Sequence, residues 1–454
     1  MNSVNVLIVS RETIKPSSPT PQNLKCFKLS LLDQLAPAAY VPMILYYAPT
    51  ADSIVKNQER INLLKKSLSQ TLTKFYPLAG RVKQNLFIEC NDQGIDFIEA
   101  KLNCSLSDIL RRPEAHILDR FLPQEYHFHV SSSSTKCSQM GIQVNSFSCG
   151  GMAIGTSISH KLVDGITFTS FINTWAAMAR GSNDNLLSPI FVGPHIFPPK
   201  DIYGLLPVLD IPKAKNTTKR FVFDLSKIGL LRERLFGNGN SSVNNKNNNN
   251  NNNLPSRVEI VSALIWKCAI DASRTKKPSF STQTVNLRAR MDPPLPESAA
   301  GNLLWLAIAP APSDGSSKIE IQDLVYQVRN ALKKFDTDYV KKLQGENGSL
   351  VLEETLKQIT ELALKHVDIY RFTSLRKFQL YEGDFGWGKP VWISSAGLTF
   401  KNVVVLIESR AGDRVEAWVT LDQQEMAVFE CNQEILSFDS PTHNSSFLLL
   451  NSNL

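Results

Sequence analysis

The chain of 454 residues predicts a mixed α/β architecture with two layered domains. Short apolar runs typical of buried strands alternate with segments of helical periodicity in each half of the chain. A proline-rich stretch without clear periodicity, residues 188–215, lies between the halves and is typical of a crossover between domains. We therefore expect an N-terminal domain over residues 1–195, a crossover linker over 196–217 and a C-terminal domain over 218–454.

Apolar runs and periodic stripes indicate the elements of the first half. The run 41–47 has the length of a buried strand, and apolar residues at spacings of three and four over 61–75 indicate a helix that ends before Pro77. Two short strands, a hairpin broken at its glycines and a buried amphipathic helix are also expected. They cover residues 87–90, 96–100, 141–147, 152–158 and 168–180.

The second half contains an unusual insertion. A strand over 220–223 and a helix over 225–236 are followed by a tract of nearly pure asparagine, residues 238–253. Such a tract has no apolar side chains to bury, so we expect a disordered surface insertion, with binding or aggregation as the alternatives. Three more helices and two more strands are expected. They cover residues 258–268, 324–335, 352–369, 401–407 and 415–419.

The composition argues against several classes of function. No apolar stretch approaches the about 18 residues that cross a bilayer, and the run 4–9 lacks the basic leader of a signal peptide. We therefore expect a soluble, cytoplasmic protein without a membrane partner. The net charge of +7 is spread along the chain, which gives little reason to expect nucleic-acid binding. The seven cysteines have no metal-ligand spacing, so we interpret them as buried thiols without disulfides or metal.

A histidine and an aspartate four residues apart form the sharpest local feature. His160 and Asp164 lie between the expected hairpin and the helix that follows it. Histidine accepts a proton near neutral pH, and a positioned base accelerates a reaction by about 10²- to 10⁴-fold. A structural histidine is the more common case for such a pair taken alone. Its interpretation therefore depends on the rest of the chain.

Four further segments give this pair a context. They are YPLAGR at 76–81, VNLRAR at 285–290, PPLP with Gly301 and Asn302 at 293–302, and DFGWGKP at 384–390. Together with SHKLVDG at 159–165, they make the chain resemble the BAHD acyltransferases of plants. The resemblance extends from residue 17 to residue 419, with the asparagine tract as an unmatched insertion.

The resemblance implies a chloramphenicol acetyltransferase-like fold, in which two similar domains of mixed sheet and flanking helices enclose a channel. It also implies a monomer that uses acetyl-CoA or another acyl-CoA as co-substrate, with no permanently bound cofactor. His160 would remove the proton of an acceptor alcohol as its oxygen attacks the thioester. Because the thioester is already activated, no serine or cysteine nucleophile is needed.

Asp164 has two interpretations. It could orient the imidazole, as in the triads of hydrolases. The resemblance favours a structural role, in which Asp164 pairs with Arg288 at the seam between the domains. It also places the Thr373 hydroxyl near the oxyanion. Where the family commonly has tryptophan this chain has Leu375, and the loss of one oxyanion donor costs about 10²- to 10³-fold in rate.

The resemblance gives the DFGWG segment a structural role. Asp-Phe-Gly also holds magnesium in kinases, but no glycine-rich phosphate loop or HRD segment accompanies it here. In the family this loop shapes the second domain and the CoA side of the channel. We expect Asp384, Gly386, Trp387 and Gly388 to support the site, with backbone freedom supplied by the two glycines.

For CoA, the resemblance places contacts at the start of a second-half helix, at Ser256 and Arg257. Ser256 is equally credible as the N-cap of that helix. Trp266 and Trp305 are interpreted as core residues rather than ligand-binding ones, because buried aromatic side chains usually pack.

The acceptor is the least determined part of the function. Segments such as SSPTPQNLK and LSLLDQ look closest to the branch of the family that acetylates hydroxyl groups of alkaloids and terpenoid-type scaffolds. We expect acetyl transfer to a plant specialised metabolite, preferably an alkaloid, and terpenoid or limonoid alcohols, acyl sugars and phenolics stay open. The competing classes are a non-catalytic binding homologue, which Leu375 alone supports, and a thioesterase.

Overall fold

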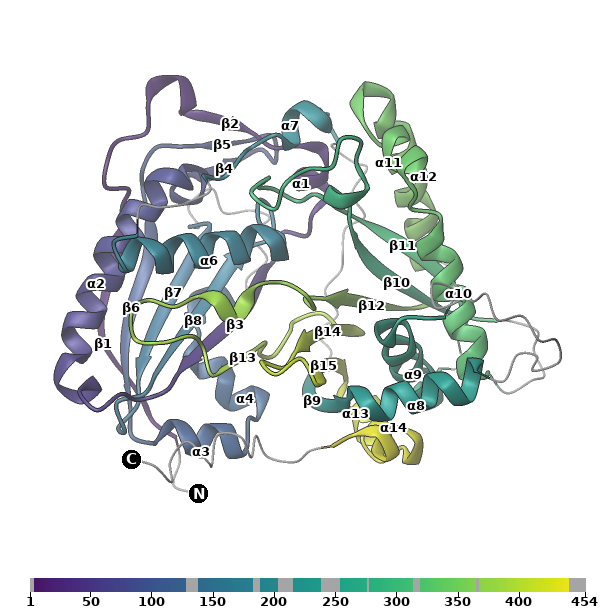
Figure 1. Ribbon diagram of the computed structural model, residues 1–454. Helices are drawn as coiled ribbons and strands as arrows, with labels where there is room; N and C mark the ends of the chain where they lie inside the picture. The colour runs from purple at the N-terminus through teal and green to yellow at the C-terminus, as the bar shows by residue number, and fades with distance from the viewer. Residues whose placement is uncertain are drawn as a thin grey trace, which may run out of the picture.

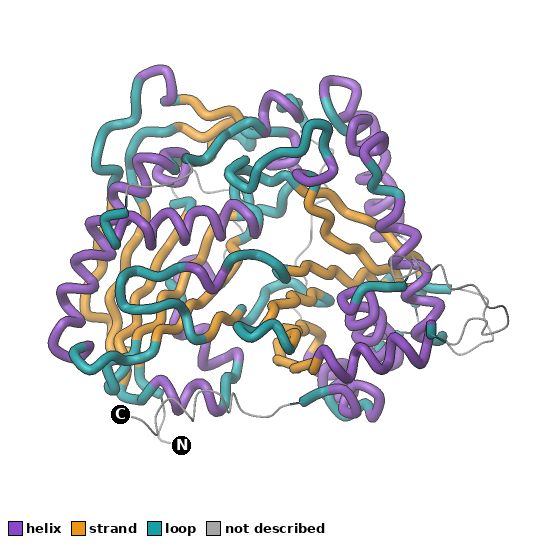
Figure 2. The backbone as a smooth tube through the Cα atoms, viewed as in Figure 1, coloured by secondary structure: helices purple, strands orange, loops and turns teal. Residues whose placement is uncertain are grey.

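In the part of the chain that the structure describes, helices pack around two six-stranded sheets, and a small three-stranded sheet accompanies them. Figure 1 shows the two large sheets side by side, and Figure 2 shows the helices placed around the strands. The expected mixed α/β fold with two sheet-containing domains is confirmed. Among the described residues, no helix is long and apolar enough to cross a membrane. The computed structural model describes residues 4–127, 138–182, 188–202, 215–237, 254–275, 277–312, 319–364 and 367–440.

The first sheet has the strand order β1-β6-β7-β8-β3-β13. Only β6 and β7 pair in parallel, and the other neighbours are antiparallel. The hairpin expected from the sequence is confirmed as β7 and β8, whose residues are all buried. The strands are β1 (Val6–Ile14), β3 (Tyr40–Tyr47), β6 (Ile95–Leu102), β7 (Met140–Ser146), β8 (Met152–Ser159) and β13 (Trp392–Ser394).

Two long helices, α2 (Ser53–Lys74) and α6 (Gly165–Ala179), pack against each other beside this sheet. The apolar stripe predicted for α2 is buried. The helix begins at Ser53, earlier than predicted, and the sequence pattern missed its first two turns because they are largely exposed and carry no apolar stripe. The shorter elements of this half are β2 (Cys26–Lys28), α1 (Leu31–Leu35), β4 (Arg81–Lys83), β5 (Phe87–Glu89), α3 (Leu106–Arg111), α4 (Ala115–Leu118), α5 (Gln124–His127) and α7 (Gly193–Ile196).

The second sheet has the strand order β11-β10-β12-β14-β15-β9. Its three central strands, β10, β12 and β14, run parallel, and the outer pairs are antiparallel. The strands are β9 (Asn216–Asp224), β10 (Ser279–Asn286), β11 (Leu304–Pro310), β12 (Asp368–Ser374), β14 (Val403–Glu408) and β15 (Arg414–Asp422).

Helix α9 (Arg257–Ala272) is the central helix of the second half and packs against α8, α10 and α13. Trp266 and Trp305 both lie in the core of this half, as expected. Figure 1 shows α10, α11 and α12 at the outer edge of the molecule. The other helices are α8 (Leu225–Phe236), α10 (Ile321–Lys333), α11 (Thr337–Lys342), α12 (Gly345–Leu364), α13 (Gln423–Phe429) and α14 (Gln433–Phe438).

The second half also corrects the sequence prediction. The helix expected over 352–369 ends at Leu364, and β12 begins at Asp368. The polar strand β10 was not predicted, because it buries Ser281, Thr282 and Gln283 where a strand pattern would have apolar residues. Polar side chains in the interior of the molecule therefore hid one of the central strands.

One strand links the two halves. β13 belongs to the second half by sequence, yet it pairs with β3 in the first sheet. Trp392 of β13 stacks on Tyr46 with ring centroids 4.7 Å apart, and its indole donates to the Glu416 carboxylate (3.1 Å). Glu416 also accepts from Arg220 Nε (2.7 Å) and Nη2 (2.8 Å). The domain limits drawn from the sequence stay a prediction.

The cysteines depart from the expectation of buried thiols. The six within the described part of the chain are free, and Cys90 and Cys268 are buried. Cys26 and Cys431 are exposed instead. In β2 the neighbouring Phe27 takes the buried side of the strand, so Cys26 faces solvent. Cys137, linker residues 203–214 and the asparagine tract 238–253 lie outside the described residues.

Candidate active site

His160 and Asp164 lie in the turn between β8 and α6, as the sequence predicted. The backbone N–H of His160 donates to the carbonyl of Ala39 (2.9 Å). Asp164 is the N-cap of α6 and accepts from the backbone N–H of Thr167 (2.9 Å). A carboxylate at this position satisfies a free donor of the first turn and interacts favourably with the helix dipole. The turn is therefore fixed at both ends.

Asp164 makes a buried ion pair with Arg288. Arg288 donates from Nη1 to Oδ2 (2.7 Å) and from Nη2 to Oδ1 (3.1 Å), and the two residues are 2% and 4% exposed. Arg288 Nε donates to the carbonyl of Ala299 (2.9 Å). Among the described residues, no hydrogen bond joins Asp164 to His160. The two carboxylate oxygens are thus engaged by α6 and by the second half of the chain.

The imidazole of His160 contacts an amide instead. Nδ1 lies 2.9 Å from Asn302 Oδ1. Asn302 Nδ2 uses its two hydrogens elsewhere, because it donates to the His160 carbonyl (2.7 Å) and to Asp33 Oδ1 (2.9 Å). The amide oxygen is therefore the acceptor, which places the proton of the neutral imidazole on Nδ1. Nε2 keeps its lone pair, as a general base requires.

Asp33 binds Asn302 through its carboxylate. This buried carboxylate accepts from the backbone N–H (2.8 Å) and Nδ2 (2.9 Å) of Asn302, and from the backbone N–H (3.0 Å) and hydroxyl (2.6 Å) of Ser30. Burial raises the pKa of Asp33, and the hydrogen bonds from Ser30 and Asn302 oppose that rise. Asp33, Asn302 and His160 therefore form one hydrogen-bonded row that joins α1, the segment before β11 and the turn that carries His160.

Lys161 is a buried cation next to the histidine in sequence. Its Nζ donates to the carbonyl of Gln34 (2.9 Å). Burial lowers the pKa of Lys161 to about 8, and attraction to the negative charge of Asp33 opposes that fall. The interior beside His160 thus holds a buried carboxyl group and a buried amine, Asp33 and Lys161.

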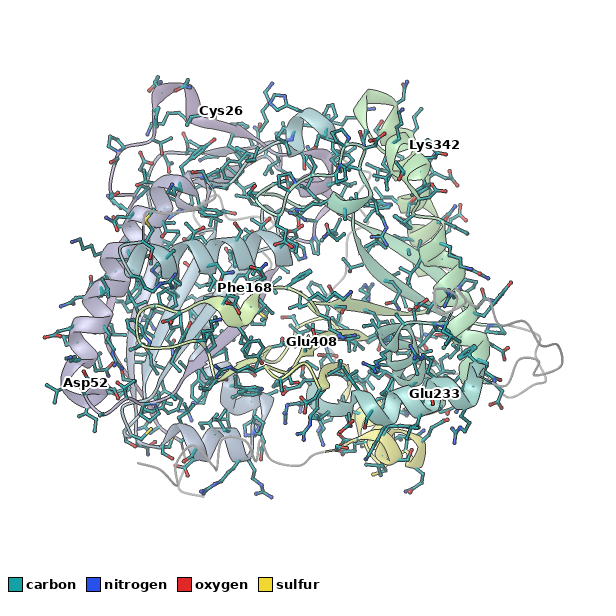
Figure 3. The ribbon with its side chains drawn as sticks, in the orientation of Figure 1. Cys26, Asp52, Phe168, Glu233, Lys342 and Glu408 are labelled. Carbon is teal, nitrogen blue, oxygen red and sulfur yellow. The ribbon has the colours of Figure 1, made fainter. Side chains whose placement is uncertain are left out.

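Leu375, which follows β12, approaches this turn, and Thr373 lies two residues before it in the strand. Thr373 is half-buried near the end of the strand. Leu375 packs against the start of α6, since a Cβ added to Gly165 would lie 2.8 Å from Leu375 Cδ2. A cavity of about 240 Å³ is lined by Leu375, Phe378 and the turn 408–412. Figure 3 shows Glu408, at the end of β14, in the central region between the halves.

The DFGWG loop is held by its own aspartate. Asp384 Oδ1 accepts from the backbone N–H groups of Gly386 (2.8 Å) and Gly388 (3.0 Å). Both glycines have φ in the left-handed region, +108° and +106°, which side chains rarely adopt. Glycine is therefore required at these two positions for the loop to close on Asp384.

The same loop corrects the expectation that it shapes the second domain. Phe385 lies in the core of the first half, 4.9 Å from the Trp175 ring. Trp387 stacks on Phe385 at 5.7 Å, and the guanidinium of Arg60 lies 5.3 Å from the Trp387 ring centroid. The aromatic side chains of the loop pack on α2, α6 and β3, so the loop joins the second half to the first.

At the start of α9 the structure shows an N-terminal cap. Ser256 Oγ accepts from the backbone N–H of Glu259 (3.2 Å), and Glu259 accepts in return from the Ser256 N–H (2.5 Å). This reciprocal capping box satisfies two backbone donors and accounts for Ser256 by itself. Arg257 is exposed. The CoA contacts assigned to these two residues stay a prediction.

Sequence reasoning missed the roles of Asn302 and Asp33. Asn302 was part of a segment that carried the resemblance, but nothing in its neighbourhood indicated a contact with His160. Asp33 lies three residues after Ser30, a spacing typical of a helix cap, and the structure shows that cap at α1. Its second task, holding Asn302, depends on residues more than 260 positions away, which no local pattern contains.

Comparison with known proteins agrees with this architecture. The Transferase family matches residues 4–436. Stemmadenine O-acetyltransferase of Catharanthus roseus is 37% identical over 429 residues, which cover 93% of this chain and 95% of that protein. Limonoid 21-O-acetyltransferase of Melia azedarach is 37% identical over 445 residues, which cover 96% and 99% of the two chains. Vinorine synthase of Rauvolfia serpentina is 37% identical over 426 residues, or 92% and 95%.

Solved structures give the same result. The crystal structure of vinorine synthase matches with a TM-score of 0.81 at 35% identity, covering 97% of this chain and 100% of that one. TRI101 of F. sporotrichioides, solved with coenzyme A and T-2, matches with a TM-score of 0.68 at 16% identity over 91% and 98% of the chains, and so shares the fold. The chain therefore belongs to the BAHD transferase family and is an acyl-CoA-dependent O-acyltransferase.

Proposed function

We propose that this protein transfers an acetyl group from acetyl-CoA to a hydroxyl group of a plant specialised metabolite. The observation that carries the proposal is the hydrogen bond from His160 Nδ1 to Asn302 Oδ1, because it leaves Nε2 with a lone pair. A base at that atom is what the attack of an alcohol on a thioester needs. The two relatives named O-acetyltransferases support acetyl as the acyl group.

In the proposed reaction, His160 Nε2 takes the proton of the acceptor hydroxyl while its oxygen attacks the thioester carbonyl. The imidazolium keeps its Nδ1–H on Asn302 Oδ1, and Asp33 accepts from Asn302 behind it. When the tetrahedral adduct collapses, the C–S bond breaks and the CoA thiolate takes the proton from Nε2. The histidine returns to its starting tautomer, and no covalent enzyme intermediate forms.

Thr373 is the proposed donor to the oxyanion of the tetrahedral adduct. Its position near the end of β12, two residues before the contact of Leu375 with Gly165, supports this role. Leu375 has no N–H to add a second donor. We expect a correspondingly slower chemical step, because the loss of one oxyanion donor costs about 10²- to 10³-fold.

Asp164 has a structural part in this proposal. Its oxygens cap α6 and bind Arg288, so they hold the turn that carries His160 in place. The Asp384, Gly386, Trp387 and Gly388 loop supports the site in the same way, by fixing α6 and β3 from the other side. Neither group is proposed to move a proton.

For the donor, we propose that the start of α9 contacts the phosphates of CoA. Ser256 is engaged in its capping box, which leaves the exposed Arg257 as the group best suited to an anion at a helix N-terminus. The protein is proposed to act as a cytoplasmic monomer. In support, His160, Asn302 and Arg288 come from one chain, and the six described cysteines are free, as in a reducing compartment.

For the acceptor, we propose an alkaloid alcohol. The stemmadenine and vinorine enzymes support this class. A limonoid or other terpenoid alcohol is the alternative, and the limonoid 21-O-acetyltransferase supports it. Acyl sugars and phenolics have no such support among these relatives.

The test is acetyl-CoA consumption with pooled alkaloid and terpenoid alcohols, followed by mass measurement of the product. We expect acceptor-dependent release of CoA and a product heavier by one acetyl group. His160→Ala should lower the rate at least about 10²-fold, since it removes the general base. His116→Ala, at an exposed histidine, is the matched control and should retain the native rate.

Three outcomes would contradict the proposal. Full activity of His160→Ala would show that another group removes the proton. Saturable binding without turnover of any pool or donor would favour a non-catalytic binding homologue. Release of CoA without an acceptor would indicate a thioesterase.

A further inference from the structure

Arg371 lies on the same face of β12 as Thr373. Successive side chains of a strand point to opposite faces. Tyr370 and Phe372 pack in the core of the second half, and the Tyr370 hydroxyl donates to the carbonyl of Ala269 in α9 (3.2 Å). Arg371 and Thr373 therefore face away from α9.

This face is turned toward the first half of the molecule. The β14 partners of Arg371 and Thr373 are Val403 and Val405, and both pack with the core of the first half. Leu375, the next residue on the face, packs against Gly165 at the turn that carries His160. The row that begins at Arg371 thus leads past Thr373 to the residue that follows Asp164.

The charge of Arg371 has no acidic partner within the described part of the chain. Its one side-chain hydrogen bond there is a long one, from Nη1 to the carbonyl of Ile369 in its own strand (3.5 Å). Arg290 donates to the carbonyls of Phe335 (3.1 Å) and Asn286 (2.9 Å), while three other arginines are paired with a carboxylate. These pairs are Arg288 with Asp164, Arg220 with Glu416 and Arg376 with Glu408.

The side chain of Arg371 is exposed, so its guanidinium is open to a ligand. Burial nevertheless lowers the pKa of its guanidinium, and no carboxylate opposes that fall. The guanidinium reaches solvent on the strand face that is turned toward the first half of the molecule. A guanidinium does not give up its proton, so an exposed one without a carboxylate partner on this face is available to an anionic ligand.

We infer that Arg371 binds a carboxylate carried by one of the two substrates. A guanidinium and a carboxylate match as a bidentate pair. Two steps along a strand, at about 3.3 Å each, place Arg371 about 7 Å from Thr373. The inference rests on the proposed function, which puts Thr373 beside the reacting carbonyl.

The distance between Arg371 and Thr373 limits which anion can be the ligand. The phosphates of CoA are separated from the thioester by the whole pantetheine arm, so they lie too far from the carbonyl to reach Arg371. A carboxylate on the acceptor alcohol, or on the acyl group of a dicarboxylic acyl-CoA, lies within reach. The shared chemistry is a carboxylate close to the new ester bond.

The experiment compares native protein with Arg371→Met in two arms. The donor arm measures kcat and KM with malonyl-CoA and acetyl-CoA, and the acceptor arm uses 4-hydroxycyclohexanecarboxylate and its methyl ester. In one arm we expect the variant to raise KM for the carboxylate member about 10- to 10²-fold, the value of a charged hydrogen bond. The neutral member should change little, and Arg371→Lys should restore part of the preference.

Lys342→Met is the matched control, because it removes one positive charge at the outer end of α11 (Figure 3). It should leave both members of each pair unchanged. Calorimetric Kd values for the same probes test carboxylate binding directly and do not require turnover. Selective loss of carboxylate binding in Arg371→Met supports the inference even if acyl transfer fails. Equal effects of Arg371→Met on both members of both pairs overturn it, even if acyl transfer is established.

Discussion

The hydrogen bond between His160 and an amide is the central feature of the candidate site. A hydrolase triad fixes its histidine with a carboxylate, but here a neutral amide, Asn302, accepts from His160 Nδ1. The amide is itself oriented by Asp33, which accepts from Nδ2. The negative charge therefore stays one residue away from the imidazole. This arrangement provides orientation, while the attraction of a directly bound carboxylate for the imidazolium is absent.

Substitution of that amide tests the arrangement. Asn302→Leu removes the acceptor of the Nδ1 proton, so the ring is free to turn and to adopt the other tautomer. We expect kcat to fall about 10²-fold with a smaller change in KM, because a positioned base contributes about 10²- to 10⁴-fold. Steady-state kinetics with the best acceptor measure this.

Ser30→Ala serves as its control. It perturbs Asp33 from the side opposite Asn302 and leaves the contact with His160 in place. If Ser30→Ala lowers kcat as much as Asn302→Leu does, the loss reflects general disturbance of the buried network and not the tautomer.

At the scale of an element, one side chain ties the start of helix α6 to both halves of the molecule. Asp164 caps the helix within the first half and pairs with Arg288 from the second half. The ion pair is buried, so loss of either partner would leave an uncompensated charge in the interior and would destabilise the fold. The start of α6, and with it the turn that carries His160, is therefore located by both halves of the molecule.

The substitution Asp164→Asn keeps the N-cap acceptor of α6 but removes the negative charge that pairs with Arg288. The amide oxygen can still accept from the Thr167 N–H, but Arg288 loses its counter-ion. We expect the free energy of unfolding to fall by about 3–5 kcal/mol, the cost of breaking a buried pair. Denaturation in urea measures it, and Asp164→Asn with Arg288→Met should recover part of the loss.

The hydrolase-like alternative makes the opposite prediction for this variant. If Asp164 acted on the imidazole, kcat would fall steeply while the free energy of unfolding stayed near the native value. That result would move Asp164 from the structural to the catalytic group.

At the scale of the molecule, the two halves exchange elements. The second half supplies β13 to the first sheet and the DFGWG loop to the first core. Trp392, Glu416 and Arg220 join the sheets at this crossing. Leu31 and Leu32 of α1 in turn pack in the core of the second half, so neither half has a complete core by itself.

Expression of residues 1–195 alone tests this interdependence. Without β13, the edge of β3 and the surface around Tyr46 are exposed, so we expect an aggregating or dye-binding fragment without cooperative unfolding. Co-expression with residues 218–454 should restore a soluble complex. Cooperative unfolding of the isolated fragment, followed by circular dichroism, would show that the first half is self-sufficient.

Much of the fold was predictable because local patterns carry it. The stripe of α2 and the β7–β8 hairpin follow from periodicity, and the junction after β8 placed His160 correctly. β10 was missed because its buried residues are polar, and residues 352–369 were assigned to one helix because apolar periodicity does not mark where α12 ends and β12 begins. In both cases tertiary burial overrode the local signal.

The sequence by itself determined the family resemblance, the fold class and the pair His160 and Asp164, since motifs and periodicity are local properties of the chain. Only the tertiary structure decided that Asn302 orients His160, that Asp33 orients Asn302, and that Arg371 faces the first half without an acidic partner in the described residues. The physical reason is distance along the chain. Hydrogen bonds and desolvation act over a few ångströms in space, and these residues become neighbours only when the two halves pack.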